Sequence, residues 1–181
     1  MHRLHFRKAA LILLGHLAVF ISVNGAKAVA APPSCPPETA YQVGVAQIDI
    51  TPAYPIRLSG FGFRRTESEG VTQPIWAKAL AVDDGTGEPA VLITVDNLGV
   101  PDELVTEVAT RLQRQAGVKR ERLAVTATHT HTAPMLKGVA PTLFGMPIPA
   151  DHQERIDRYT RELTDKLEEV VLDALDSRAP A

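Results

Sequence analysis

The chain of 181 residues contains a single cysteine, Cys35, so it cannot form an internal disulfide. This cysteine lies in the proline-rich segment 32–37, whose composition is typical of a stiff, extended tether. The residues before it do not resemble a lipoprotein signal. We therefore expect a free thiol outside the core.

Long apolar runs are also missing, and no segment has the roughly 20 apolar residues that a membrane-spanning helix needs. The longest run, 9–23, follows three basic residues and precedes the triplet 26–28, which has the small residues that a signal peptidase reads. This order predicts a secretory signal peptide over 1–28, followed by a proline-rich tether over 29–40. We expect the mature chain to be exported to the periplasm or the extracellular space.

Positive charge is scarce once the predicted signal peptide is removed. Residues 1–28 hold four basic residues and no acidic one, so the net charge changes from −2 to −6. Nucleic acids and anionic lipids bind clustered cations, and the mature sequence has no such cluster. This excludes a nucleic-acid partner and a polybasic lipid anchor. Peripheral contact with a membrane stays open, and the oligomeric state is not indicated.

Several catalytic signatures are absent, among them a P-loop, a nucleophile elbow and a cysteine-based zinc cluster. The sequence also shows no internal repeat. Residues 41–181 amount to one domain's worth of chain, and a hydrophobic content of 45% allows them to build a core.

The hydrophobic pattern of 41–181 predicts an α/β fold with a mixed sheet and flanking helices. Apolar and β-branched runs bounded by turn residues are typical of strands, and two segments repeat apolar residues at helical spacing. Asp151 and Glu154 have capping-box spacing at the start of the second helix. Residues 53–74, rich in glycine and charge, are predicted to form a long surface loop. The predicted strands are 43–51, 76–83, 90–95 and 123–126, and the predicted helices are 101–116 and 151–176.

The order of these elements predicts where a site lies. Strands 76–83 and 90–95 flank a glycine-rich turn and should form a hairpin. Strand 90–95, the helix after it and the next strand form a β-α-β unit, whose strands are expected to be parallel. Their carboxyl ends then share one edge of the sheet, where open α/β sheets place their sites. Asp96 leaves the first of these strands, and His129 follows the second.

His129 and His131 are the main candidates for chemistry. Residues two apart in an extended segment point to the same face, about 6.6 Å apart, so the two imidazoles are expected to project together. Neutral imidazole is a good zinc ligand, whereas the alternative is a pair of ordinary surface histidines. Asp96 is a candidate to hydrogen-bond a ligating histidine, with a structural role in an Asx-type turn as its alternative.

Three further features have structural interpretations beside any functional one. Asp49 is predicted to make a hydrogen bond at the end of its strand. His152 is expected to be solvated in the first turn of an exposed helix. The segment Gly60-Phe61-Gly62-Phe63 either forms a flexible lip over a pocket or packs as an ordinary turn.

The segment around the two histidines resembles a known family signature. Residues 127–134, Ala-Thr-His-Thr-His-Thr-Ala-Pro, are similar to the A-T-H-T-H-S-G-P signature of the neutral, non-lysosomal ceramidases. A helix is predicted where the family has one, over 153–175. Three more segments resemble family motifs in the same order along the chain, namely 43–51 (G-x-G-x-A-D-I-T), 70–79 (G-I-H-x-R-x-W-A-R-A-F) and 94–99 (T-D-L-G-M).

This resemblance implies a zinc amidohydrolase that cleaves the N-acyl bond of ceramide to a sphingoid base and a fatty acid. It also implies that His129 is a zinc ligand, and that His131 lies beside the metal and hydrogen-bonds the reacting groups. The chain departs from the family at Thr72 and Pro74, where the family has His and Arg, and at 132–133, where it has Ser-Gly. These departures concern ceramide as the substrate more than the metal.

The family completes its zinc site with a second His, a Glu and a Tyr from far downstream, beyond residue 181. A catalytic zinc takes three protein ligands, so we expect this chain to be the N-terminal part of a longer enzyme and inactive alone. Two alternatives stay open. One is a metal-dependent amidase or esterase for another substrate, and the other is a non-catalytic secreted binding protein on the same scaffold.

Overall fold

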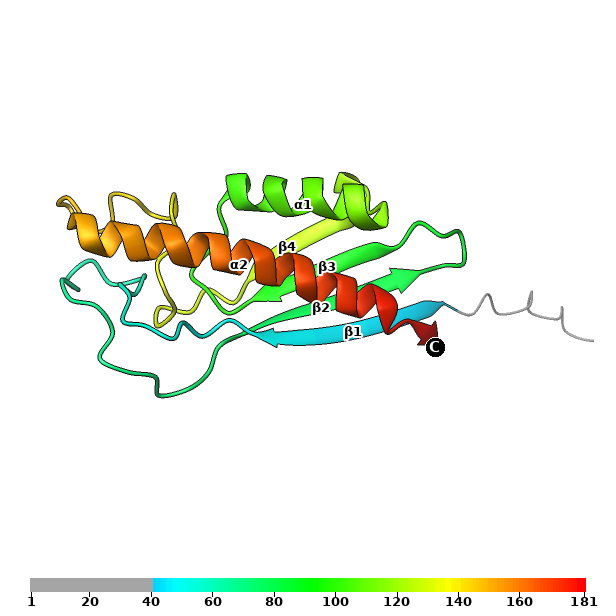
Figure 1. Cartoon of the computed structure of the whole chain (residues 1–181), viewed down its shortest axis with the longest axis horizontal. Helices are drawn as coiled ribbons and strands as arrows, with labels where there is room; N and C mark the ends of the chain where they lie inside the picture. The colour runs from blue at the N-terminus through cyan, green and yellow to red at the C-terminus, as the bar shows by residue number, and fades with distance from the viewer. Residues whose placement is uncertain (1–40) are drawn as a thin grey trace, which may run out of the picture. The chain divides into compact units, whose positions relative to one another are not determined.

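The computed structural model describes residues 41–181, so the predicted signal peptide, the tether and Cys35 lie outside the described residues. The described chain forms a mixed sheet of order β4-β3-β2-β1-β5 with two α-helices, which confirms the predicted α/β fold. In chain order the elements are β1 (Gln42–Asp49), β2 (Trp76–Asp83), β3 (Ala90–Val95), α1 (Asp102–Ala116), the 3₁₀ helix η1 (Arg120–Arg122), β4 (Leu123–Ala127), α2 (Ala150–Asp176) and β5 (Ala179–Pro180) (Figure 1).

The strand pairing follows the predicted connections. β2 and β3 form the expected antiparallel hairpin, and β3 and β4 are parallel, as the β-α-β unit requires. Val95 lies opposite Ala127 at the end of this parallel pair, so both strands finish at the same edge of the sheet. β1 pairs with β2 along its whole length in the antiparallel sense. The loops that follow β3 and β4 therefore start side by side.

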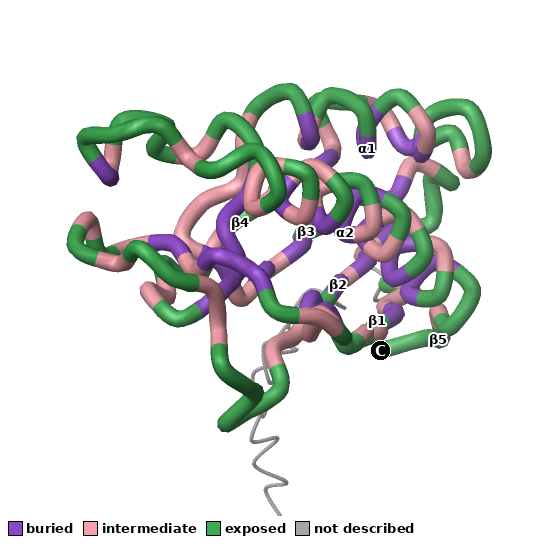
Figure 2. Tube along the Cα trace, turned by 60° about the vertical axis from the view of Figure 1, so that its left-hand side comes forward, coloured by how far each residue is buried: buried purple, intermediate pink, exposed green. Residues whose placement is uncertain are grey.

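Both helices lie on one face of the sheet (Figure 1), and the core is the layer between the helices and the sheet. Figure 2 shows buried residues concentrated between these helices and the central strands. The alternating alanines of β2 are short, so α2 can approach the strand closely, and its own apolar stripe fills the gap. No helix among residues 41–181 is both long and apolar enough to cross a membrane. The buried residues that face each other across this layer include Ala77, Ala79, Ala81, Ile93, Leu104, Val108, Ile156, Leu163 and Leu167.

The predicted end of α1 is confirmed, whereas the predicted cap at the start of α2 is wrong. α1 ends at Gly117, which adopts φ 69° and donates its N–H to the Gln113 carbonyl, as the predicted glycine stop requires. α2 begins one residue earlier than expected, after Pro149, and has no side-chain cap. The predicted capping box is wrong, because Asp151 lies inside the first turn. Its carboxylate instead pairs with Arg155 at 2.7 Å.

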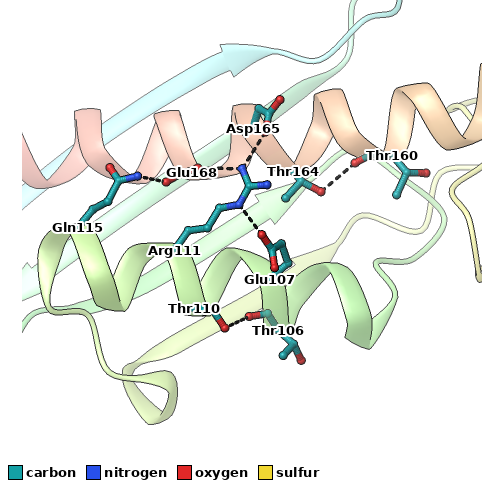
Figure 3. A network of polar contacts seen from close by, with 9 residues as sticks. All are labelled: Thr106, Glu107, Thr110, Arg111, Gln115, Thr160, Thr164, Asp165 and Glu168. Atoms are coloured by element: carbon teal, nitrogen blue, oxygen red, sulfur yellow. Dashed lines mark hydrogen bonds and ion pairs between the residues drawn. The ribbon is translucent and has the colours of Figure 1, made fainter.

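An ion-pair network fixes the two helices against each other (Figure 3). Arg111 of α1 contacts Asp165 at 2.8 Å and Glu168 at 3.0 Å on α2, and Glu107 of its own helix at 2.7 Å. Gln115, one turn further on, also donates to Glu168. The bonds to Glu107, Asp165 and Glu168 raise the pKa of Arg111 above its ordinary value. The two carboxylates of α2, Asp165 and Glu168, thus hold α1 beside α2 through one guanidinium.

The end of β1 is anchored by side-chain hydrogen bonds. Asp49 accepts a bond from the Thr51 N–H at 2.7 Å, which confirms its predicted role. The Thr51 hydroxyl, and to a smaller extent this N–H, lower the pKa of Asp49. The buried Tyr159 hydroxyl of α2 donates to the Ile50 carbonyl at 2.8 Å, and burial raises the pKa of Tyr159. The chain is therefore fixed to α2 just before it enters the loop that leads to the site.

Candidate functional site

The two histidines lie in the loop that follows β4, at the edge where β3 and β4 end. The N–H of Thr128 donates to the Val95 carbonyl at 3.0 Å, which extends the parallel pairing by one bond. The chain then leaves the sheet at His129. The sequence-based position of the histidines at the carboxyl edge of the β-α-β unit is confirmed.

The histidine segment turns instead of staying extended. His129 has φ 60°, in the left-handed region that residues with a side chain rarely adopt. The prediction of an extended segment through His129 and His131 is therefore wrong. The two rings nevertheless meet, with centroids 5.2 Å apart and an interplanar angle of 68°. The two imidazoles are therefore neighbours, as expected, but a turn and not an extended strand brings them together.

The hydrogen bond of His129 sets which ring nitrogen is free. Its Nδ1 lies 2.9 Å from the Leu98 carbonyl oxygen. A carbonyl oxygen can only accept, so Nδ1 carries the hydrogen, and Nε2 of the neutral ring keeps its lone pair. A backbone carbonyl on the second nitrogen is a usual support for a metal-ligating histidine. His129 is exposed, so Nε2 is available to a ligand.

His131 is held by the loop between β1 and β2. The Phe61 ring meets the His131 ring edge-on, with centroids 5.0 Å apart. The Arg64 guanidinium donates to the His131 carbonyl at 2.6 Å and to the Ser59 carbonyl at 3.1 Å. Gly60 adopts φ 98°, and a Cβ there would lie 2.5 Å from the His131 Cβ, so only glycine fits.

The loop 53–74 is more buried than the sequence predicted. Ile56, Arg57 and Ser59 are buried, and an antiparallel bridge joins Leu58 to Pro134, just after the histidine segment. The prediction of a simple surface loop is therefore wrong. Backbone hydrogen bonds join the loop to the segment after His131: the Ser59 N–H donates to the Ala133 carbonyl at 3.0 Å, and the Met135 N–H donates to the Arg57 carbonyl at 2.8 Å.

Arg57 is the largest of these buried side chains, at 2% exposed. Its guanidinium donates to the Arg64 carbonyl at 2.6 Å and lies 4.1 Å from the centroid of the Phe144 ring. Burial lowers the pKa of Arg57. The half-buried His152 places Nδ1 3.4 Å from this guanidinium, so the expected fully solvated His152 is not observed.

Asp96 links the ends of two strands. Its carboxylate accepts from the Trp76 N–H at 3.0 Å, and its own N–H donates to the Trp76 carbonyl at 2.9 Å. Together with Thr130 and Thr132, it lines a pocket of about 570 Å³ beside the histidine segment. Among residues 41–181, the group that bonds the His129 ring is the Leu98 carbonyl. A bond from Asp96 to a ligating histidine stays a prediction.

Comparison with known proteins shows which family this chain resembles. Residues 41–143, more than half of the chain and including both histidines, match the sequence profile of the neutral/alkaline non-lysosomal ceramidases, N-terminal. The chain belongs to this family. It is 32% identical over 97 residues to the neutral ceramidases of Drosophila melanogaster and Drosophila pseudoobscura pseudoobscura. The aligned part covers 52% of this chain and 14% of each of these relatives.

Solved ceramidases share the fold of this chain. A neutral ceramidase from Pseudomonas aeruginosa superposes with a TM-score of 0.63 at 20% identity. A ceramidase complexed with C2 gives a TM-score of 0.62 at 21% identity. Each superposition covers 78% of this chain and 22% of the solved chain. The fold described here is therefore that of one part of a ceramidase.

The site of this ceramidase-family chain fits one ligand position of a metal centre. His129 has a free Nε2, a fixed tautomer and an exposed position. Within residues 41–181, however, no group of three or more His, Cys, Asp or Glu side chains could hold a metal ion. A catalytic zinc takes three protein ligands, so the described residues do not complete such a site.

Sequence reasoning missed several groups that position the histidines in this family member. The Leu98 carbonyl and the Arg64 guanidinium bond the two histidine residues directly, and Gly60 and Phe61 pack against His131. A backbone carbonyl has no signal in a sequence. For Gly60 and Phe61, the Gly-Phe-Gly-Phe segment indicates a lip or a turn, but it does not indicate a contact with His131.

Proposed function

We propose that this chain is the N-terminal part of a secreted, zinc-dependent amidohydrolase. Its substrate is ceramide or a related acyl-amide lipid, which is cleaved at the N-acyl bond to a sphingoid base and a fatty acid. The observation that carries the proposal is the Leu98 carbonyl on Nδ1 of His129, which leaves Nε2 as a metal ligand in the signature of a ceramidase family. Family membership supports the substrate class.

The residues of this chain have distinct tasks in that reaction. His129 would hold zinc through Nε2, and zinc when bound lowers the pKa of a water molecule and polarises an amide carbonyl. His131 touches the His129 ring and would hydrogen-bond the reacting amide. Phe61 and Arg64 fix His131 in place, so that its imidazole needs little reorganisation during the reaction.

The small number of zinc ligands in the described residues supports an active protein that is longer than this chain. The described residues offer one well-prepared ligand, and the chain spans 14% of the curated relatives that it matches. We infer that the other ligands come from polypeptide outside these residues. The chain by itself is then expected to bind zinc weakly and to have no appreciable amidase activity.

A second candidate is a metal-dependent amidase or esterase for a different acyl substrate. Thr72 and Pro74, which replace the family's His and Arg, both line the pocket beside Thr130. The wall of this pocket therefore differs in charge from the family pattern. Comparing ceramide with simple acyl amides and esters as substrates separates the two candidates.

The experiment that tests the function uses the complete gene product with three matched histidine variants. We expect His129→Ala to lose zinc, and His131→Ala to keep zinc but lose about 100-fold in rate, because it removes a group that acts in the transition state. His152→Ala is the control and should change neither property. Unchanged metal content and turnover in all three variants would mean that His129 and His131 are ordinary loop histidines and would refute their proposed roles. Absence of both metal and turnover in the unaltered gene product would favour a non-catalytic binding protein.

We also propose that the protein is exported, since its first residues have the order of a signal peptide. Sequencing the amino terminus of exported material should find a start between Val29 and Pro32. Exported material that begins at Met1 would contradict the cleavage.

A further inference from the structure

We propose that residues 61–65, here called the aromatic tip, dock on the headgroup layer of a phospholipid surface. The aromatic tip consists of Phe61, Gly62, Phe63, Arg64 and Arg65. This inference deepens the proposed function, because an acyl-amide lipid substrate lies in such a surface.

Two aromatic rings of the tip face water together. Phe63 is 76% exposed and Phe61 is 39% exposed. Their rings stack with centroids 5.5 Å apart and an interplanar angle of 25°. Single exposed apolar residues are ordinary, but two adjoining exposed rings form a surface that favours an apolar or interfacial partner.

The tip is held in shape before any partner binds. The Arg64 N–H donates to the Phe61 carbonyl at 3.1 Å and closes a turn. Gly62 packs closely on the loop between β4 and α2, so that a Cβ at this position would lie 2.7 Å from the Leu143 carbonyl oxygen. The two phenylalanines are therefore presented on a fixed turn, which reduces the entropy lost on docking.

The charges of the tip complement a phosphate layer. The guanidiniums of Arg64 and Arg65 donate to backbone carbonyls, and no ion pair found within residues 41–181 includes either of them. Positive charge without a carboxylate contact thus flanks two exposed rings. Aromatic rings and arginines occur together where a protein meets lipid headgroups, with the ring in the interface and the cation near phosphate.

The tip and the histidine pair are continuous. Phe61 touches Phe63 on one side and His131 on the other, with ring centroids 5.5 Å and 5.0 Å apart. His131 in turn contacts His129. A lipid surface against the tip would therefore bring lipid to the proposed metal ligand. The acidic chain provides little long-range attraction to anionic lipid, so the rings should dominate and binding to zwitterionic vesicles should resist salt.

A tryptophan reporter tests docking at this position in the full chain. Trp76 is the only tryptophan, so Trp76→Phe gives a silent background into which Phe63→Trp is introduced. Val45→Trp in the same background is the matched control, because Val45 is 66% exposed. The preceding Gly44 faces Ala174 of α2, so Val45 points to the opposite face of the sheet. Emission is recorded with and without phosphatidylcholine vesicles, in low and high salt.

We expect vesicles to shift the emission of the reporter at position 63 to shorter wavelength and to leave the control unchanged. In the otherwise unaltered chain, Phe63→Ser should weaken vesicle partitioning about tenfold, the effect of removing one buried ring. An unshifted reporter at position 63 would overturn the proposal and favour a protein partner. Equal shifts at both positions would overturn it as well, because docking would not be specific to the tip.

Docking and catalysis fail separately in this design. Vesicle binding is measured without turnover and should persist in His129→Ala. Absence of hydrolase activity in the unaltered complete gene product, with docking retained, would count against the proposed function alone. Full activity on detergent-dispersed substrate with no vesicle docking would count against the aromatic tip alone.

Discussion

Replacing Gly60 with alanine tests how the loop between β1 and β2 supports the site. Gly60 adopts φ 98°, and a Cβ at this position would lie 2.5 Å from both Cβ and Cγ of His131. Alanine therefore meets two separate obstacles, a backbone conformation that disfavours any Cβ and a steric overlap with the histidine. The control is Gly85→Ala, because Gly85 has a similar φ of 88° and no atom within 4 Å of the added Cβ.

The two variants separate the backbone strain from the contact. The positive φ should cost about 1–2 kcal/mol at either glycine. The overlap with His131 should add about 1–3 kcal/mol at Gly60 alone, because the ring and its backbone must move. We therefore expect Gly60→Ala to lower the free energy of unfolding by about 2–5 kcal/mol, well beyond Gly85→Ala.

Urea denaturation measures both free energies of unfolding, and NMR of the His131 ring reports whether it moves. The ring resonances should change in Gly60→Ala, since His131 leaves its contact with Phe61. They should stay unchanged in Gly85→Ala. Equal stability losses in the two variants, together with an unmoved His131 ring, would refute the packing described for this loop.

Two further predictions concern the contacts of α2 with the segment after β1. Tyr159→Phe should lower the free energy of unfolding by about 1–3 kcal/mol, measured by urea denaturation, because the Ile50 carbonyl loses its buried partner. For Glu162, burial acts to raise the pKa, but hydrogen bonds from Tyr54 and Arg158 together lower it below its ordinary value of 4.5. Its carboxylate therefore stabilises the fold above that pH and loses the effect as the pH falls through the lowered pKa. Thermal unfolding should show Glu162→Gln less stable than the unaltered protein at pH 7, with the difference vanishing in acid.

The secondary structure was predictable because its signals are local. The alternation in β2, the glycine-rich turn before β3 and Gly117 after α1 each act within a few residues of the chain. The parallel pairing of β3 with β4 followed from the helix between them. These signals were enough to place His129 at the carboxyl edge of the sheet.

The details of the site depend on contacts between distant residues. His129 adopts its left-handed φ in a turn. Its ring bonds the Leu98 carbonyl, 31 residues earlier in the chain. The burial of Arg57 depends on Phe144, His152 and the carbonyls of its own loop, and no local pattern indicates that a charged side chain enters the core. Sequence reasoning could therefore name the two histidines but not the groups that hold them.

The most direct test of the central claim is a zinc titration of the full chain followed by ¹⁵N NMR of its imidazole rings. The hydrogen bond to Leu98 predicts that Nε2 of His129 shifts on zinc addition while Nδ1 keeps its hydrogen. Binding should be weak, should disappear in His129→Ala and should persist in His131→Ala. A zinc-induced shift of Nδ1 of His129, or loss of the ion in His131→Ala with retention in His129→Ala, would contradict Nε2 of His129 as the zinc ligand.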